Sequence, residues 1–242
     1  MCCGADEDVS KTNEGLKFSE MKFYEFEFIN DTIHILDYPT ADKVLELPND
    51  HIVKRLKDMC LHWHDLTEAK LCLEAIDDTN SALVNRALAQ NAIVVFYKCF
   101  GTSKFRNNSL NRDKILARLP SGAKDVFDYY KNIRDKFIVH DESRHAQVIT
   151  GLILETAKTP PFVDTVNTVA VTEMFATENQ LQGLRSFHHL VTVAILWTEN
   201  TIDELSDEIK KTYQSKPLSF FDNFSPLKLN APTEEELFQK RY

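Results

Sequence analysis

The sequence has little glycine, and its few glycines form no phosphate-binding loop. Only 6 of the 242 residues are glycine, and they are scattered along the chain. Phosphate loops need closely spaced glycines, because the backbone must approach the phosphate oxygens. The chain also lacks a Gly-x-Ser-x-Gly segment and a His-Glu-x-x-His segment. A nucleotide hydrolase and a metalloprotease therefore lack support in the sequence.

Cysteine is sparse, and long apolar runs are missing. No stretch approaches 18 consecutive apolar residues, and no charged-then-apolar leader opens the chain. We therefore expect a cytoplasmic protein that neither spans a membrane nor is secreted. The cysteines are odd in number and show no zinc-site spacing, so we expect reduced thiols and no metal or other cofactor. They are Cys2, Cys3, Cys60, Cys72 and Cys99.

Positive charge is in deficit. The chain has 28 Lys and Arg residues against 37 Asp and Glu residues, which gives a net charge of −9. This balance argues against broad, non-specific binding of nucleic acid, which needs a positive surface. The deficit is uneven, however, because the segment from Lys98 to Arg118 contains six basic residues and one acid, Asp113. Either this segment leads an RNA backbone towards Arg134, or it forms a solvated loop. The candidate RNA-binding residues are Lys98, Lys104, Arg106, Arg112 and Lys131.

Helical periodicity dominates the chain and predicts a mainly α fold. Apolar residues at spacings of three and four predict helices over 50–76, 81–100, 112–119, 121–141 and 178–213, with Asp50 and Ser121 as N-caps. Alternating or β-branched segments predict short strands within 22–47 and a β-hairpin at about 147–172. We expect a polar N-terminus with a short β segment (1–49), a helical bundle with the hairpin inserted (50–215), and a C-terminal extension (216–242).

The helix predicted from Ser121 carries an arginine and a histidine at the edges of one apolar stripe. Val126, Tyr130, Ile133 and Phe137 share a helical face, because they recur at spacings of four, three and four. In a straight helix Arg134 and His140 lie about 120° apart around the axis and about 9 Å apart along it. They would meet only if the last turn loosens, or if a second copy of the helix packs on the stripe and adds its own pair.

Arg134, Asp135 and His140 in this spacing resemble the R-x(4–6)-H motif of the HEPN (higher eukaryotes and prokaryotes nucleotide-binding) superfamily. Long amphipathic helices on both sides of the motif agree with that resemblance, which covers about residues 50–215. The pattern is most similar to HEPN proteins of abortive-infection and toxin–antitoxin systems. The resemblance implies a HEPN-like helical bundle, a homodimer and a metal-independent ribonuclease. One departure is Glu142, which stands where some HEPN toxins carry a tyrosine that a partner enzyme modifies.

The chemistry expected of this motif is cleavage of RNA by attack of the ribose 2′-hydroxyl. His140 would transfer the proton, and Arg134 would bind the phosphate oxygens as charge builds in the transition state. Asp135 would orient Arg134 or hold the substrate. The expected partners are an RNA substrate, a second copy of the chain and an antitoxin or regulatory protein. The alternative function is a catalytically inactive helical interaction or regulatory module, in which Arg134 pairs with Glu74 or Asp77.

Three other pairs that contain histidine are weaker candidates for a metal or catalytic site. His62 and His64 point about 160° apart on a helix, so they cannot easily share a metal ion. His188 and His189 are adjacent on a helix and have the same problem. Arg144-His145 repeats the chemistry of the motif, but it lies at a predicted junction between a helix and a strand. We expect none of these pairs to form a site.

Overall fold

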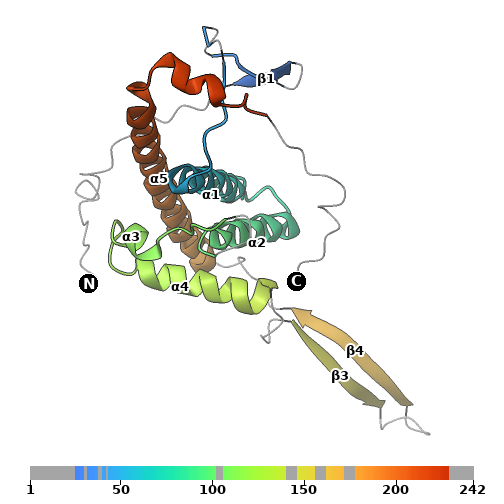
Figure 1. The fold of residues 1–242 in the computed structure, drawn as a ribbon. Helices are drawn as coiled ribbons and strands as arrows, with labels where there is room; N and C mark the ends of the chain where they lie inside the picture. The colour runs from blue at the N-terminus through green and yellow to red at the C-terminus, as the bar shows by residue number, and fades with distance from the viewer. Residues whose placement is uncertain are drawn as a thin grey trace. The chain divides into compact units, whose positions relative to one another are not determined.

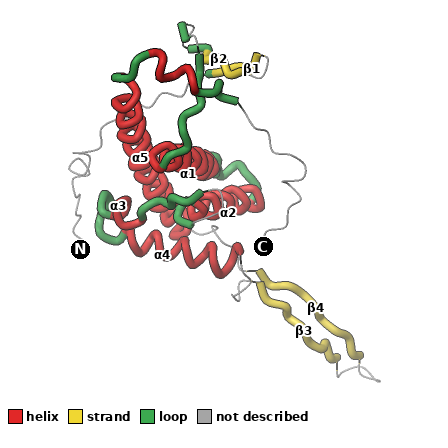
Figure 2. The backbone as a smooth tube through the Cα atoms, viewed as in Figure 1, coloured by secondary structure: helices red, strands yellow, loops and turns green. Residues whose placement is uncertain are grey.

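The chain is mainly helical, and it contains two small two-stranded antiparallel sheets. Figures 1 and 2 show these elements in the computed structural model. The predicted mainly α fold with two β segments is therefore confirmed. The described residues form two compact units, the first within 58–199 and the second within 25–57 and 200–228. The structure describes residues 25–29, 32–37, 40–41, 43–101, 106–139, 146–155, 162–171 and 178–228.

The first unit is built from helices whose bounds lie close to the predicted ones. It contains most of α1 (His51–Glu74), α2 (Ala82–Lys98), α3 (Arg112–Leu116), α4 (Ala123–Ile133) and the first part of α5 (Glu178–Gln214). Asp50 caps α1 as predicted, because its Oδ1 accepts a hydrogen bond of 2.9 Å from the Val53 amide. Ser81 caps α2 in the same way.

The centre of the first unit is a cluster of aromatic rings on α2, α4 and α5. Phe96 of α2 and Phe187 of α5 are fully buried, with ring centroids 5.1 Å apart. Tyr130 of α4 packs on Phe187 at 4.5 Å. The hydroxyl of Tyr97 donates a hydrogen bond of 2.6 Å to the carbonyl oxygen of Phe127. These edge-to-face and tilted contacts join the three helices in one core and fix the position of α4.

The start of α4 differs from the prediction. Gly122, and not Ser121, is the N-cap residue, and no side chain caps the helix. Gly122 has a φ of 99°, and the Ala123 amide bonds the Pro120 carbonyl at 3.2 Å. A type II turn needs a positive φ at its third residue, which glycine adopts without strain. The predicted serine cap is wrong because the chain enters α4 through this turn.

The second unit contains a small hairpin and a folded C-terminal segment. Strands β1 (Phe26–Ile29) and β2 (Thr32–Ile35) pair antiparallel, with Phe26 opposite Ile35. The 3-10 helix η3 (Leu218–Asn223) follows α5. Its Phe220 and Phe221, and Phe224 directly after it, lie around Tyr213 with ring centroids about 6 Å from the Tyr213 ring. A β-bridge joins Leu45 to Pro226. Part of the predicted C-terminal extension is thus ordered against its own chain.

The predicted β-hairpin at about 147–172 is confirmed as strands β3 (Ala146–Glu155) and β4 (Phe162–Val171). The two strands pair antiparallel over ten residue pairs, from Ala146 opposite Val171 to Glu155 opposite Phe162. Within the described part of the chain, no helix has both the length and the apolar character that a bilayer crossing requires.

Candidate functional site

The apolar stripe of α4 is mostly used inside the chain. Tyr130 and Ile133 are buried, and Val126 is half-buried. Only Phe137, at 39% exposure, leaves a substantial apolar surface towards solvent. Because Phe187 of α5 already covers Tyr130, a second copy could not pack on the whole predicted stripe. The exposed large apolar side chains of α4 and the turn after it, within the described residues, are Tyr129, Phe137 and Val139.

The helix does not continue straight to its end. Residues Arg134–Val139 form a π-helical segment, η2, directly after α4. A π-helix closes its hydrogen bonds between residues five apart, so its turns are wider than those of an α-helix. A loosened last turn, one of the two conditions under which Arg134 and His140 could meet, is therefore present up to Val139. The separation expected for a straight α-helix does not apply here.

Arg134 is the first residue of this widened turn. Its side chain is 33% exposed, and its Nη1 donates a hydrogen bond of 2.9 Å to Oδ1 of Asp135. Its Nε is buried, and no described residue accepts a hydrogen bond from it. A buried donor without an acceptor costs free energy, unless a ligand or water supplies the acceptor. Among the described residues this Nε donor has no acceptor, and because the atom is buried, a phosphate oxygen could reach it only after neighbouring side chains move.

Asp135 holds Arg134 from one side. Its other carboxylate oxygen, Oδ2, accepts a hydrogen bond of 2.7 Å from Lys131. The hydrogen bond from Lys131 is the main cause that lowers the pKa of Asp135, and the charge of Arg134 adds to it. The ion pair of Arg134 is therefore with its neighbour Asp135, and not with Glu74 or Asp77 as the structural alternative expected.

His140 lies outside the described residues, and so do Arg144, His145, Glu142 and Lys104. The description of the motif helix ends at Val139. The catalytic assignment of His140 therefore stays a prediction. The same holds for the convergence of its imidazole with Arg134.

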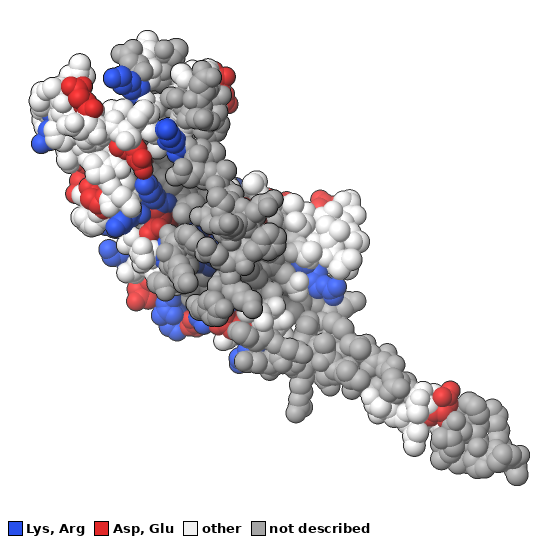
Figure 3. Space-filling model, turned by 45° about the vertical axis from the view of Figure 1, so that its right-hand side comes forward, with Lys and Arg blue, Asp and Glu red and all other residues white. Residues whose placement is uncertain are grey.

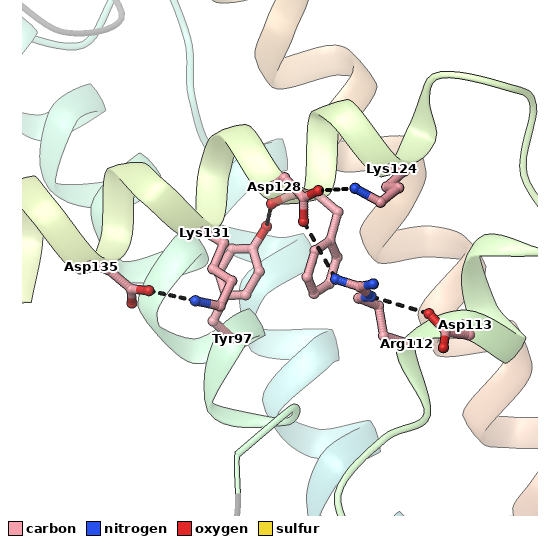
Figure 4. A network of polar contacts seen from close by, with 8 residues as sticks. Tyr97, Arg112, Asp113, Lys124, Asp128, Lys131 and Asp135 are labelled. Carbon is pink, nitrogen blue, oxygen red and sulfur yellow. Dashed lines mark hydrogen bonds and ion pairs between the residues drawn. The ribbon is translucent and has the colours of Figure 1, made fainter.

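The four described candidate RNA-binding residues all contact carboxylates. Lys98 and Arg106 both bind Asp65. Arg112 contacts Asp113 at 3.2 Å and Asp128 at 3.5 Å, and Lys131 contacts Asp135. Figure 4 shows the exposed part of this network along α4, with Asp128 between Lys124 and Arg112. On the face drawn in Figure 3, several basic and acidic side chains lie next to one another.

A buried polar stripe on α1 was not anticipated from the sequence. Asp58, His62 and Asp65 follow one another at spacings of four and three, and all three are buried. Asp58 Oδ2 accepts hydrogen bonds from the amides of Asn107 (3.2 Å) and Asn108 (3.0 Å) and from the Asn108 side chain (2.7 Å). The stripe fixes the segment that links α2 to α3. The spacing itself was the available signal, but it suits a solvated helix face equally well.

The two other members of this stripe carry perturbed pKa values. Burial lowers the pKa of His62, whose Nε2 lies 2.7 Å from the Asn108 carbonyl oxygen. Its Nδ1 is buried without a described partner. Burial alone would raise the pKa of Asp65, but hydrogen bonds from Arg106 and Lys98 outweigh burial and lower it. The folded chain therefore favours a neutral imidazole at His62, next to an ionised Asp65 that is paired with Arg106 and Lys98.

The histidines of the pairs His62 and His64 and His188 and His189 occupy separate environments. His64 is exposed on α1, whereas His62 is buried. His188 Nε2 lies 3.5 Å from Glu74, which also binds Lys70. His189 instead lines a cleft between α5 and the start of α4. Among the described residues, no group of three or more His, Cys, Asp or Glu side chains is arranged to hold a metal ion.

Two clefts open on the helices of the first unit. The first, of about 490 Å³, lies between the turn before α4 and the first part of α5, and Arg185 and His189 line it. The second, of about 480 Å³, lies between the end of α1 and α5, and it is lined by Glu74, Asp77 and His188 among others. Arg134 lines neither cleft.

Comparisons of the chain with protein-family models, with curated proteins and with solved structures find no match.

Proposed function

We propose that the chain is a metal-independent endoribonuclease of the HEPN type, acting in a bacterial defence or toxin–antitoxin system. The observation that carries the proposal is the state of Arg134. Arg134 lies at the start of a widened helical turn, and its side chain is one-third exposed. No described residue accepts a hydrogen bond from its Nε. π-Helical turns are rare, and those that occur lie frequently at functional sites. A forked, permanently charged cation that is one-third exposed suits the non-bridging oxygens of a phosphodiester.

In this mechanism the 2′-hydroxyl oxygen of a ribose attacks the neighbouring phosphorus, and the bond from phosphorus to the 5′-oxygen breaks. His140 takes the proton of the 2′-hydroxyl or donates one to the leaving 5′-oxygen. Arg134 stabilises the charge that builds on the phosphate oxygens in the transition state. Asp135, bonded to Arg134 and Lys131, keeps the guanidinium in one orientation. The products are a cyclic phosphate and a free 5′-hydroxyl.

The test is cleavage of a bacterial RNA pool in the presence of EDTA, with analysis of the fragment ends. The parent should release fragments with cyclic-phosphate ends. Arg134→Ala should lower the cleavage rate by about 10²–10³-fold, as removal of an oxyanion donor does. His140→Ala should lower it by about 10²–10⁴-fold. Both variants should unfold at nearly the parental denaturant concentration; for Arg134 the reason is that its side chain is one-third exposed.

Matched controls separate the loss of chemistry from the loss of charge or fold. Lys136→Ala removes an exposed cation from the same turn, and His64→Ala removes an exposed imidazole from α1. Both should cleave RNA like the parent. Cleavage by Arg134→Ala and His140→Ala at the parental rate would show that the assignment is wrong.

A second candidate function is a helical interaction or regulatory module without activity. It is favoured by the carboxylate contacts of the four described candidate RNA-binding cations and by the net charge of −9. Under this alternative the parent leaves the RNA pool intact, and so do all the variants. Expression of the parent in bacteria would then also be harmless.

A further inference from the structure

The hairpin of β3 and β4 is unusually regular and unprotected. Its ten pairs run without a bulge, and neither strand contains proline, lysine or arginine. Native edge strands are commonly protected by these features, because an open edge can pair with another chain. Among the described strands, β3 bonds only β4. Within the described part of the chain, one long edge of β3 is therefore unpaired.

This edge is also uncharged. The nine residues Ala146–Leu154 carry no charge, on a chain whose net charge is −9. Leu152 is 73% exposed and Ile153 is 45% exposed. Because neighbouring residues of a strand point to opposite faces, apolar surface meets water on both sides of the ribbon. A second copy could approach this edge without the repulsion expected elsewhere on an acidic chain.

We propose that β3 pairs antiparallel with β3 of a second copy, about a two-fold axis at Thr150. The two hairpins then form one four-stranded sheet in the order β4, β3, β3, β4. A two-stranded hairpin is only marginally stable in water, whereas three or more strands support one another. The second copy is a suitable occupant, because it offers an open edge of the same length and the same uncharged composition.

The register follows from the alternation of faces. A two-fold axis normal to the sheet keeps each face on its own side, so directly opposed residues must share a face. Centring on Thr150 sets Val148 opposite Leu152 of the second copy and Ala146 opposite its Leu154. Every pair within Ala146–Leu154 is then uncharged, and Glu155 falls outside the pairing. The outer strand β4 contains the acidic residue Asp164. Its charge would disfavour pairing of β4 with β4 of a second copy.

The test is the mass of the full-length chain in solution over a range of concentrations. The parent should form a concentration-dependent dimer. Thr150→Lys sets two like charges directly opposite each other, and it should weaken dimerisation by about tenfold or more. Thr165→Lys is the matched control, because it adds the same charge to an exposed threonine of β4. It should leave the dimer intact.

A charge swap tests the register itself. Thr150→Glu should also weaken the dimer, but an equimolar mixture with Thr150→Lys should restore it, because opposite charges then face each other. A parent that stays monomeric at all concentrations overturns the proposal. A Thr150→Lys dimer as strong as that of the parent overturns it as well, because the copies would then meet elsewhere. These masses do not depend on RNA cleavage, so the pairing of the hairpins and the ribonuclease can fail separately.

Discussion

At the scale of single residues, His62 is a titratable side chain in a fully buried position. Its side chain has no exposed surface, and it lies among Asp58, Asp65 and Arg106. Burial disfavours the charged imidazole. The Nδ1 atom has no described acceptor that would accommodate a second proton. The folded state therefore requires a neutral His62.

We expect this requirement to make stability depend on pH in a defined window. The pKa of His62 is lowered in the folded chain, whereas an unfolded histidine has a pKa of about 6.5. Below about 6.5 the unfolded state therefore binds more protons, and the free energy of unfolding falls as the pH falls. Urea unfolding between about pH 7.5 and 5.5 measures this slope, because the carboxylates that titrate at lower pH stay ionised there.

His62→Gln removes the titrating group and retains a donor for the Asn108 carbonyl. Its free energy of unfolding should change less between the two pH values than that of the parent. His64→Gln, two residues further along α1 and exposed, should retain the parental slope. An equal slope in the parent and in His62→Gln would contradict the assignment.

At the scale of elements, periodicity predicted the helices well because it reports burial. Of the apolar residues that define the pattern in α2, Ile93 and Phe96 are fully buried. The same logic does not find the stripe of Asp58, His62 and Asp65, because polar residues at helical spacing predict a solvated face. Their burial depends on a segment about 50 residues later in the chain, whose amides supply the hydrogen bonds.

In the candidate site, too, local features were predicted from the sequence and contacts with distant residues were not. Arg134, Asp135 and their helix were predicted, because the residues and the apolar period are local. The sequence did not predict the π-helical segment; it indicated only that a loosened last turn would let Arg134 and His140 meet. A wider turn of this kind has no distinct sequence signature. The burial of Tyr130 against Phe187 was missed, because contacts between α4 and α5 join residues more than 50 positions apart. Local sequence does not specify which neighbour covers an apolar stripe.

The close approach of α4 to α5 depends on Gly183. A Cβ atom on Gly183 would lie 2.9 Å from the hydroxyl oxygen of Tyr130, which is buried and packed on Phe187. Alanine gains about 1 kcal/mol over glycine in a helix interior. Overpacking a core typically costs about 1–3 kcal/mol. Gly183→Ala should therefore lower the free energy of unfolding by about 1 kcal/mol, measured by urea denaturation.

Removal of the Tyr130 hydroxyl should reverse the sign. In a Tyr130→Phe background the clash is gone, so Gly183→Ala should raise the free energy of unfolding by about 0.5–1 kcal/mol. The four proteins form a double-mutant cycle, and their coupling energy isolates the contact from the helix propensity. The same effect in both backgrounds would mean that the two helices adjust without strain.

At the scale of the whole molecule, the charge distribution limits how RNA could bind. The described candidate cations already contact carboxylates, as Lys98 and Arg106 do with Asp65. A phosphate that binds one of these cations would have to displace its carboxylate partner. RNA binding would therefore leave few phosphates with an additional positive charge to neutralise them. An acidic chain with one dominant cationic contact should therefore bind RNA with a weak dependence on salt.

This argument predicts a numerical slope for the proposed ribonuclease. Each neutralised phosphate of a single strand contributes about −0.7 to the slope of log K against log salt concentration. One or two phosphates would give a slope of about −0.7 to −1.4. Fluorescence anisotropy of a labelled oligoribonucleotide with the His140→Ala variant measures the slope without cleavage. Asp135→Asn in the same background weakens the hold on Lys131 and Arg134, so it should steepen the slope by about 0.7 for each phosphate gained. A slope steeper than about −4 for the variant that retains Asp135 would require a broad cationic surface, and this view of the charge distribution would then be wrong.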